Sequence, residues 1–188
     1  MKIGIDFDDC LADYCKVLID HYNKIDGTSY KIEDAITWDL GYLWGMDEKS
    51  AIDRCINFYP KEKGIEILPV YGAIEAINKL KKNELIIITG RPDTTLNFVV
   101  EWLQKHSINV FSKIIFSNQF NGEKRGKAEI CKDEEVEVFI DDHLGNVINT
   151  SKTGIKCFLM DMPWNQGDIP STVERVESWD EIVERINK

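Results

Sequence analysis

Apolar runs of strand length alternate with amphipathic helical segments along most of this chain. Residues 2–5 form a short apolar run, and residues 11–22 then carry apolar side chains at three- and four-residue spacing. That spacing is typical of a helix with one buried face. The alternation resumes after residue 69 and predicts a mostly parallel sheet with helices on both faces.

The elements predicted beyond residue 69 are short and regular. Strands are expected at residues 85–88, 113–116, 136–140 and 155–160. Helices are expected at residues 73–82, 94–105, 127–132, 143–151 and 179–186. The run at 85–88 is continuously apolar, which is typical of a strand covered on both faces. The predicted fold class is therefore α/β, a three-layer α/β/α arrangement of the Rossmann-like type.

Residues 23–68 interrupt the alternation. They are rich in glycine and aromatic residues and predict two or three short helices, one of them at 48–57, with no long strand. We expect a core domain of residues 1–22 and 69–188 and a small helical cap of residues 23–68. A cap inserted after the first strand–helix unit could cover the carboxyl ends of the strands, where open α/β sheets bind ligands.

Length and charge limit the possible partners. A chain of 188 residues, 43% hydrophobic and 30% charged, is typical of one soluble globular domain with a small insert. With 23 basic and 33 acidic residues, its formal charge is −10. Such a surface repels a nucleic acid polymer, but a metal and a few donors can still bind a small anion.

The cysteines and histidines give little support to a zinc site or a disulfide framework. Five cysteines occur without a C-x-x-C spacing, and there are only three histidines. Reduced thiols and a cytoplasmic location are expected. The first residues do not resemble a signal peptide, and no apolar run approaches the roughly 20 residues needed to span a bilayer.

Three acids follow the first predicted strand. Asp6, Asp8 and Asp9 stand within four positions, where their mutual repulsion favours a bound cation. Mg²⁺ prefers such hard oxygen ligands. The alternative is that the acids only stabilise the N-terminus of the next helix, with Asp9 as its cap.

The second predicted strand ends in a group suited to phosphate. Thr89 offers a hydroxyl, and Gly90 allows close approach of backbone N–H groups to an anion. Arg91 could add a charged contact to the substrate. The alternative is an ordinary strand-to-helix turn in which Asp93 or Thr94 caps the helix.

A lysine is unexpected at the start of the helix predicted from residue 127. A cation in the first turn opposes the helix dipole, so Lys127 is better explained if its ammonium meets a phosphate and a carboxylate. A solvated basic loop is the alternative, because Lys124 and Arg125 lie nearby. Lys124 is the second candidate for the same role.

A second acidic pair, Asp141 and Asp142, ends the strand predicted at 136–140. One could ligate a metal directly while the other holds water or the lysine. Capping of the next helix, near His143, is the alternative. Each motif alone is weak, but in combination they predict a Mg²⁺-dependent phosphoryl-transfer site.

This combination resembles the haloacid dehalogenase superfamily of phosphotransferases. The match consists of four motifs: Ile5-Asp6-Phe7-Asp8-Asp9, Thr89, Lys127 and Ile140-Asp141-Asp142. Position 9 departs from the pattern, because many members have glycine there. A narrower resemblance is to the 5′(3′)-deoxyribonucleotidase-like branch. It depends on the run Asp8-Asp9-Cys10-Leu11-Ala12-Asp13, the cap with its tryptophans, and Asp161-Met162-Pro163-Trp164-Asn165.

The resemblance implies a two-step hydrolysis of a phosphate monoester. Asp6 would attack phosphorus and form an aspartyl phosphate, and Asp8 would serve as general acid and then general base. Mg²⁺ would be bound by Asp6, by the backbone carbonyl of Asp8 and by Asp141 or Asp142, with Asp142 favoured as the direct ligand. Thr89 and Lys127 would hold the transferring group.

The expected substrate is a small phosphorylated metabolite, in particular a nucleotide, and a homodimer is left open. Four aromatic residues of the insert could stack on a nucleobase or form the insert's own core: Trp38, Trp44, Tyr42 and Phe58. A phospho-aspartate signalling module is a competing function, but its usual motif order differs. Phosphate transfer to a second substrate also stays open, whereas Asp8 argues against a dehalogenase.

Overall fold

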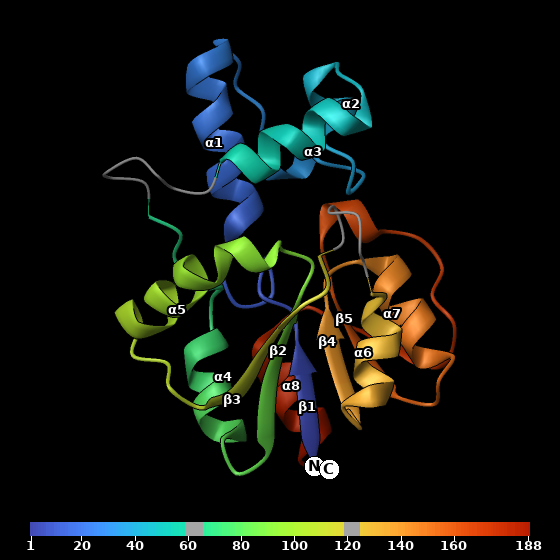
Figure 1. Ribbon diagram of the computed structural model, residues 1–188. Coiled ribbons are helices and arrows are strands. Elements are labelled where there is room, and N and C mark those ends of the chain that lie inside the picture. The colour runs from blue at the N-terminus through green and yellow to red at the C-terminus, as the bar shows by residue number, and fades with distance from the viewer. Residues whose placement is uncertain (59–65, 119–124) are drawn as a thin grey trace.

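Six parallel strands form a single sheet in the computed structural model, which describes residues 1–58, 66–118 and 125–188. The strand order is β3-β2-β1-β4-β5-β6 (Figure 1). The strands are β1 (Lys2–Ile5), β2 (Glu84–Thr89), β3 (Phe111–Phe116), β4 (Val138–Asp141), β5 (Lys156–Met160) and β6 (Val173–Val176). The chain thus starts near the centre of the sheet and builds outward on both sides, so β1 lies between β2 and β4.

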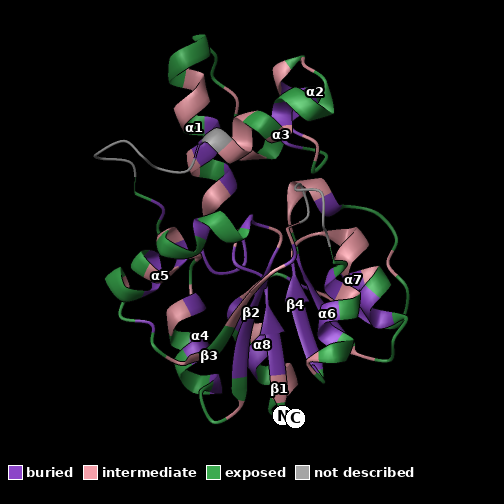
Figure 2. Ribbon diagram, in the orientation of Figure 1, coloured by how far each residue is buried: buried purple, intermediate pink, exposed green. Residues whose placement is uncertain are grey.

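Helices cover both faces of this sheet. One face packs against α4 (Ala73–Leu80), α5 (Leu96–Lys105) and α8 (Trp179–Ile186), and the other against α6 (Lys127–Asp133) and α7 (Leu144–Ser151). Alternate residues of β2 serve the two layers: Leu85 and Ile87 face the first, Ile86 and Ile88 the second. The central strands β1, β2, β4 and β5 are accordingly buried along most of their length, whereas the edge strand β3 is partly exposed (Figure 2). The predicted three-layer α/β fold is confirmed.

A separate group of helices lies above the carboxyl ends of the strands (Figure 1). It comprises α1 (Tyr14–Asp26), α2 (Gly41–Trp44) and α3 (Glu48–Asn57), with a short 3-10 turn at Ile32–Asp34. Their apolar side chains form a hydrophobic cluster distinct from the two layers beside the sheet. We call this the cap cluster; its buried members are Cys15, Leu18, Ile19, Ala35, Leu40, Leu43 and Phe58.

One arginine ties the helices of this group together. Arg54 of α3 donates two hydrogen bonds, of 2.7 and 2.9 Å, to the carboxylate of Asp26 at the end of α1. Its guanidinium also lies over the rings of Tyr22 (4.0 Å) and Trp44 (4.9 Å). The predicted boundary at residue 22 falls inside α1, and the division of the chain into core and cap stays a prediction.

Several elements begin or end a few residues from the expected bounds, and two of the differences have a clear physical reason. The first helix starts at Tyr14 instead of residue 11, because the N–H groups of Leu11 and Ala12 both donate to the carbonyl of Phe7 and close a tight loop. Strand β6 was not predicted, since only two of its four residues are apolar and they cannot mark a strand by themselves. No helix in the described ranges combines the length and apolarity needed to cross a membrane.

The buried sheet should carry much of the stability. Phe158 of β5 is fully buried, so Phe158→Ala is expected to lower the free energy of unfolding by about 3–5 kcal/mol, measured by urea denaturation. Tyr71 is 97% exposed, and Tyr71→Ala should change it by less than about 0.5 kcal/mol. Similar losses for the two variants would contradict this account of the core.

Candidate active site

Three polar residues stand at the ends of neighbouring strands. Asp6 follows β1, Thr89 is the last residue of β2, and Asp141 is the last residue of β4. Because β1 pairs with both neighbours, with Ile5 opposite Ile87 and Ile140, the three carboxyl ends lie side by side. The N–H of Asp6 donates to the carbonyl of Ile140 at 2.9 Å and extends this pairing to the site itself.

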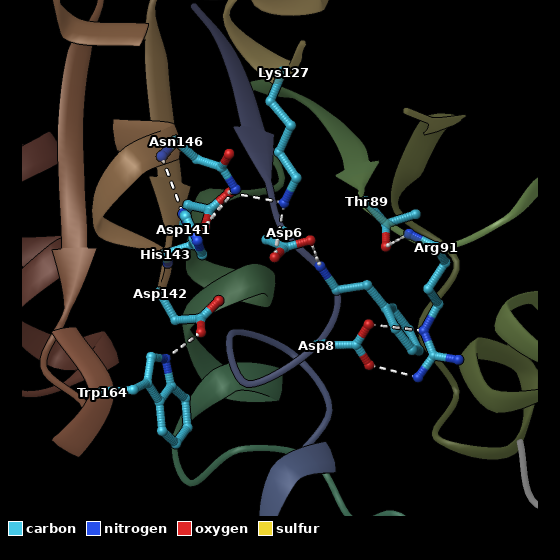
Figure 3. A network of polar contacts seen from close by, with 11 residues as sticks. Asp6, Asp8, Thr89, Arg91, Lys127, Asp141, Asp142, His143, Asn146 and Trp164 are labelled. Atoms are coloured by element: carbon cyan, nitrogen blue, oxygen red, sulfur yellow. Dashed lines mark hydrogen bonds and ion pairs between the residues drawn. The ribbon is translucent and has the colours of Figure 1, made fainter. Parts of the chain in front are cut away.

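Lys127 enters the same site from α6, where it is the first helical residue (Figure 3). Its ammonium lies 2.8 Å from Oδ2 of Asp6 and 2.7 Å from Oδ2 of Asp141, and all three side chains are buried. Burial alone would lower the pKa of Lys127, but the attraction of Asp141 and Asp6 outweighs it and raises the pKa. The expected meeting of this lysine with carboxylates is therefore present, whereas Lys124 lies outside the described residues.

The carboxylate of Asp141 accepts hydrogen bonds from several donors. Besides Lys127, the backbone N–H of His143 donates to Oδ1 at 2.7 Å, and the Asn146 amide approaches both oxygens at 3.2 and 3.3 Å. Asp141 is fully buried. A carboxylate with this many donors is held in one orientation, which suits it to fixing Lys127.

Asp142 has fewer partners and faces Asp6. Its Oδ2 accepts a 2.7 Å hydrogen bond from the indole N–H of Trp164 (Figure 3). Carboxylate oxygens of Asp6, Asp141 and Asp142 all lie within 4.8 Å of one another. Three convergent, buried carboxylates with one ammonium between them form a donor set that fits Mg²⁺, a hard cation that prefers oxygen ligands.

The acids of this site carry more negative charge than Lys127 can balance. Burial raises the pKa of Asp6 to about 7, with further increases from Asp141 and Asp8 that Lys127 only partly opposes. Burial also raises the pKa of Asp142, and the neighbouring Asp141 and Asp6 add to the effect. A bound divalent cation would remove this excess by neutralising the carboxylates.

Asp8 turns away from this group and pairs with Arg91. The guanidinium donates from Nε to Oδ2 at 2.8 Å and from Nη2 to Oδ1, so both carboxylate oxygens are engaged. Arg91 is buried among the rings of Tyr14, Phe98 and Phe7, at 4.7, 4.7 and 5.2 Å. Its predicted contact with the substrate stays a prediction.

Asp9 takes the structural role that the sequence left open. Its Oδ1 accepts hydrogen bonds from the N–H groups of Tyr14 (3.0 Å) and Cys15 (2.9 Å) at the start of α1. Its backbone has φ of 55°, a conformation that favours glycine. The two hydrogen bonds that the side chain accepts offset the cost of this strained backbone conformation.

A cavity of about 200 Å³ lies between the strand ends and the helices above them. The strand ends and the start of α6 contribute Asp6, Asp8, Gly90, Asp142 and Lys127, and the remaining wall is mainly apolar. Residues of that wall include Tyr14, Leu18, Trp38, Ile52, Ile56 and Trp164. The ring of Trp38 lies 5.6 Å from that of His143, edge to face, at one side of the cavity.

The remaining aromatic candidates lie elsewhere. Phe58 is buried in the cap cluster and Trp44 packs against it, while Tyr42 is 66% exposed. None of the three is among the described residues that line the cavity. Their contact with a substrate stays a prediction, whereas their packing is explained by the needs of a small helical core.

Three residues of the site were not predicted as site residues. Asn146 and the backbone of His143 hold Asp141, and Trp164 holds Asp142. Asn146 could not be recognised from a single sequence, because a polar residue that holds a carboxylate cannot be told apart there from a polar residue on an exposed helix surface. Trp164 had a signal, since Asp161-Met162-Pro163-Trp164-Asn165 was part of the resemblance, but the run gave no hint of its hydrogen bond.

The fold is shared with known hydrolase structures. A predicted phosphatase from Clostridium acetobutylicum superposes with a TM-score of 0.71 at 16% identity, covering 99% of this chain and 97% of that one. The haloacid dehalogenase-like hydrolase SP0104 from Streptococcus pneumoniae gives 0.71 at 15% identity, covering 98% and 97%. The putative HAD-hydrolase YfnB from Bacillus subtilis, described as bound to magnesium, gives 0.65 at 16% identity, covering 100% and 98%. The fold is that of haloacid dehalogenase-like hydrolases.

Sequence comparison narrows this class to a family. Residues 1–188 match the model of the family described as "5' nucleotidase, deoxy (Pyrimidine), cytosolic type C protein", and the chain belongs to this family. It is also 25% identical over 192 residues to "Putative nucleotidase YqfW" of Bacillus subtilis, covering 100% of this chain and 94% of that protein. The predicted resemblance is confirmed, and the protein is a hydrolase of the phosphomonoesterase type.

The charge excess at the site predicts a pH dependence of stability. Asp6 has an ordinary pKa of 3.8 and a pKa of about 7 in the folded protein. Between these values the folded state keeps a proton that the unfolded chain releases, so stability falls as pH rises from about 4 to about 7.

This dependence can be measured by urea denaturation in EDTA across that range. Asp6→Asn removes the titrating group, so its free energy of unfolding should fall less steeply than that of the unaltered protein. The difference in slope should be at most about 1.4 kcal/mol per pH unit, the value for one proton. Equal slopes would show that Asp6 is not held protonated by burial.

Proposed function

We propose that this protein is a Mg²⁺-dependent phosphomonoesterase that hydrolyses nucleoside or deoxynucleoside monophosphates through an aspartyl phosphate on Asp6. The observation that carries the proposal is the position of Lys127 between Asp6 and Asp141, with Asp142 close by. This grouping puts a nucleophile, a cation and further metal-binding oxygens at one strand edge. The cytosolic family description and the free cysteines support a cytoplasmic location.

In the first step, a carboxylate oxygen of Asp6 attacks phosphorus and the bond to the ester oxygen breaks. Asp8, in its acid form, gives its proton to that departing oxygen. In the second step, water attacks the phosphorus and transfers a proton to Asp8, and the Asp6–phosphorus linkage breaks to release phosphate. Because Arg91 engages both oxygens of Asp8, at least one of these bonds must open for Asp8 to reach the ester oxygen.

The other predicted residues hold the transferring group. Lys127 and the hydroxyl of Thr89 would bind its oxygens. The N–H of Gly90 would add a donor, because the N–H of Arg91 already donates to the Thr89 hydroxyl at 3.2 Å. Asp6 and Asp142 would bind Mg²⁺ directly, together with the backbone carbonyl of Asp8, while Asp141 orients Lys127. When bound, Mg²⁺ supplies positive charge that lets an anionic carboxylate approach an anionic phosphate.

The cavity wall supports a nucleoside as the leaving group. Trp38 and Trp164 offer aromatic faces, and stacking accepts any base. Among the described lining residues, both cations already pair with carboxylates, Lys127 with Asp6 and Arg91 with Asp8. The cavity thus favours a single phosphate on an uncharged, aromatic leaving group over one bearing further anionic groups.

Two related functions are distinguishable from this one. Phosphate transfer to an acceptor would use the same first step, and adding sugars or nucleosides to the reaction would reveal a phosphorylated product. A signalling module would keep its aspartyl phosphate for minutes without turnover. Family membership and an apolar cavity at the site favour turnover of a small substrate.

The nucleophile can be tested by phosphate release from deoxynucleoside monophosphates. Activity should require Mg²⁺ and disappear with EDTA. Asp6→Asn should lower kcat by a factor on the order of 10⁴ or more, because the amide cannot form the covalent intermediate. Appreciable turnover by Asp6→Asn would refute the assignment of the nucleophile.

The role of the apolar cavity wall in binding the leaving group can be tested with two substrates. Trp38→Ala should raise KM for a nucleoside monophosphate roughly tenfold, within the range of about 1–3 kcal/mol per stacked base. For β-glycerol phosphate, which has no ring to stack, KM should stay nearly constant. An equal effect on both substrates would place the role of Trp38 outside base recognition.

A further inference from the structure

Among the three acids of the candidate metal site, Asp142 has the simplest hydrogen bonding. Lys127 and the N–H of Phe7 occupy the two oxygens of Asp6, and several donors occupy both oxygens of Asp141. Asp142 accepts one side-chain hydrogen bond, from the indole N–H of Trp164 to Oδ2. No described residue donates to Oδ1, so Trp164 alone distinguishes the two oxygens.

Trp164 is itself held by a rigid segment. It belongs to the short 3-10 turn Pro163–Asn165 after β5. The buried Asn165 amide donates to the carbonyl oxygens of Asp142 and Met160, each at 2.6 Å. Arg175 of β6 then donates to the side chain and the carbonyl of Asn165, at 2.6 and 2.8 Å. The turn is thereby fixed both to the sheet and to the backbone of the residue that Trp164 contacts.

We propose that Trp164 is the positioning residue for Asp142, whose carboxylate it orients for metal binding. This inference rests on the metal site of the proposed function. By occupying Oδ2, the indole N–H fixes the carboxylate rotamer and leaves Oδ1 for the metal. Groups that orient a metal ligand in this way typically contribute 10–100-fold to metal affinity or activity.

The same side chain reaches the substrate side of the site. Trp164 lines the cavity and also packs against the cap cluster, which draws its residues from α1, α2 and the segments beside them. The Trp164 side chain therefore has three roles: it hydrogen-bonds to a candidate metal ligand, it forms part of the cavity wall, and it packs against the helices above the sheet. Removing its N–H while keeping an aromatic ring separates the first of these roles from the other two.

Equilibrium binding of Mn²⁺ to the metal-free protein, followed by electron paramagnetic resonance, tests the proposal without any assay of activity. Mn²⁺ takes the same oxygen ligands as Mg²⁺. Trp164→Phe should raise the dissociation constant roughly tenfold. Trp164→His keeps a ring N–H and should recover part of the affinity.

Trp102→Phe is the matched control. Trp102 is buried and, like Trp164, donates its indole N–H at 2.7 Å, but to the carbonyl of Ile67, and it is not among the described residues that line the cavity. This variant should bind Mn²⁺ like the unaltered protein. Unchanged affinity in Trp164→Phe would overturn the inference while leaving the metal site intact, whereas failure of the unaltered protein to bind Mn²⁺ would refute the metal site and the inference together.

Discussion

The buried ammonium of Lys127 is the interaction on which the site depends. It lies between Asp6 and Asp141, which come from β1 and β4, and it opposes part of their repulsion where water cannot. Without a cation there, two carboxylates could not share this strand edge in ionised form. The remaining excess of negative charge at Asp6 and Asp142 is what makes the site suited to a divalent metal.

The fold makes this arrangement possible by its strand order. Because β1 lies between β2 and β4, the residues that end these strands converge although they lie far apart in sequence. The helices above the sheet then close a cavity whose floor is acidic and whose wall is apolar. Under the proposed function, this cavity would place a phosphate at the acids and an uncharged ring against the apolar wall, so one cavity would serve both the chemistry and the choice of substrate.

Much of the fold and the main site motifs followed from the sequence because both depend on local patterns. Continuous apolar runs such as residues 85–88 mark buried strands, and acids directly after such runs mark the sheet edge. What the sequence could not give were contacts between distant segments. The pairing of Arg91 with Asp8 and the hydrogen bond from Trp164 to Asp142 span 83 and 22 positions, and no spacing rule encodes them. The helix cap at Asp9 was only one of two open interpretations, because a carboxylate serves a metal and a helix start equally well.

In the proposed reaction, the Asp6 carboxylate that pairs with Lys127 forms the bond to phosphorus. The most direct measurement is acid quenching of the protein during turnover of a ³²P-labelled nucleoside monophosphate with Mg²⁺, followed by mass spectrometry of the labelled peptide. We expect the label on Asp6, formed and lost within the time of one turnover. Label on another residue, or turnover with no labelled protein at any quench time, would contradict it.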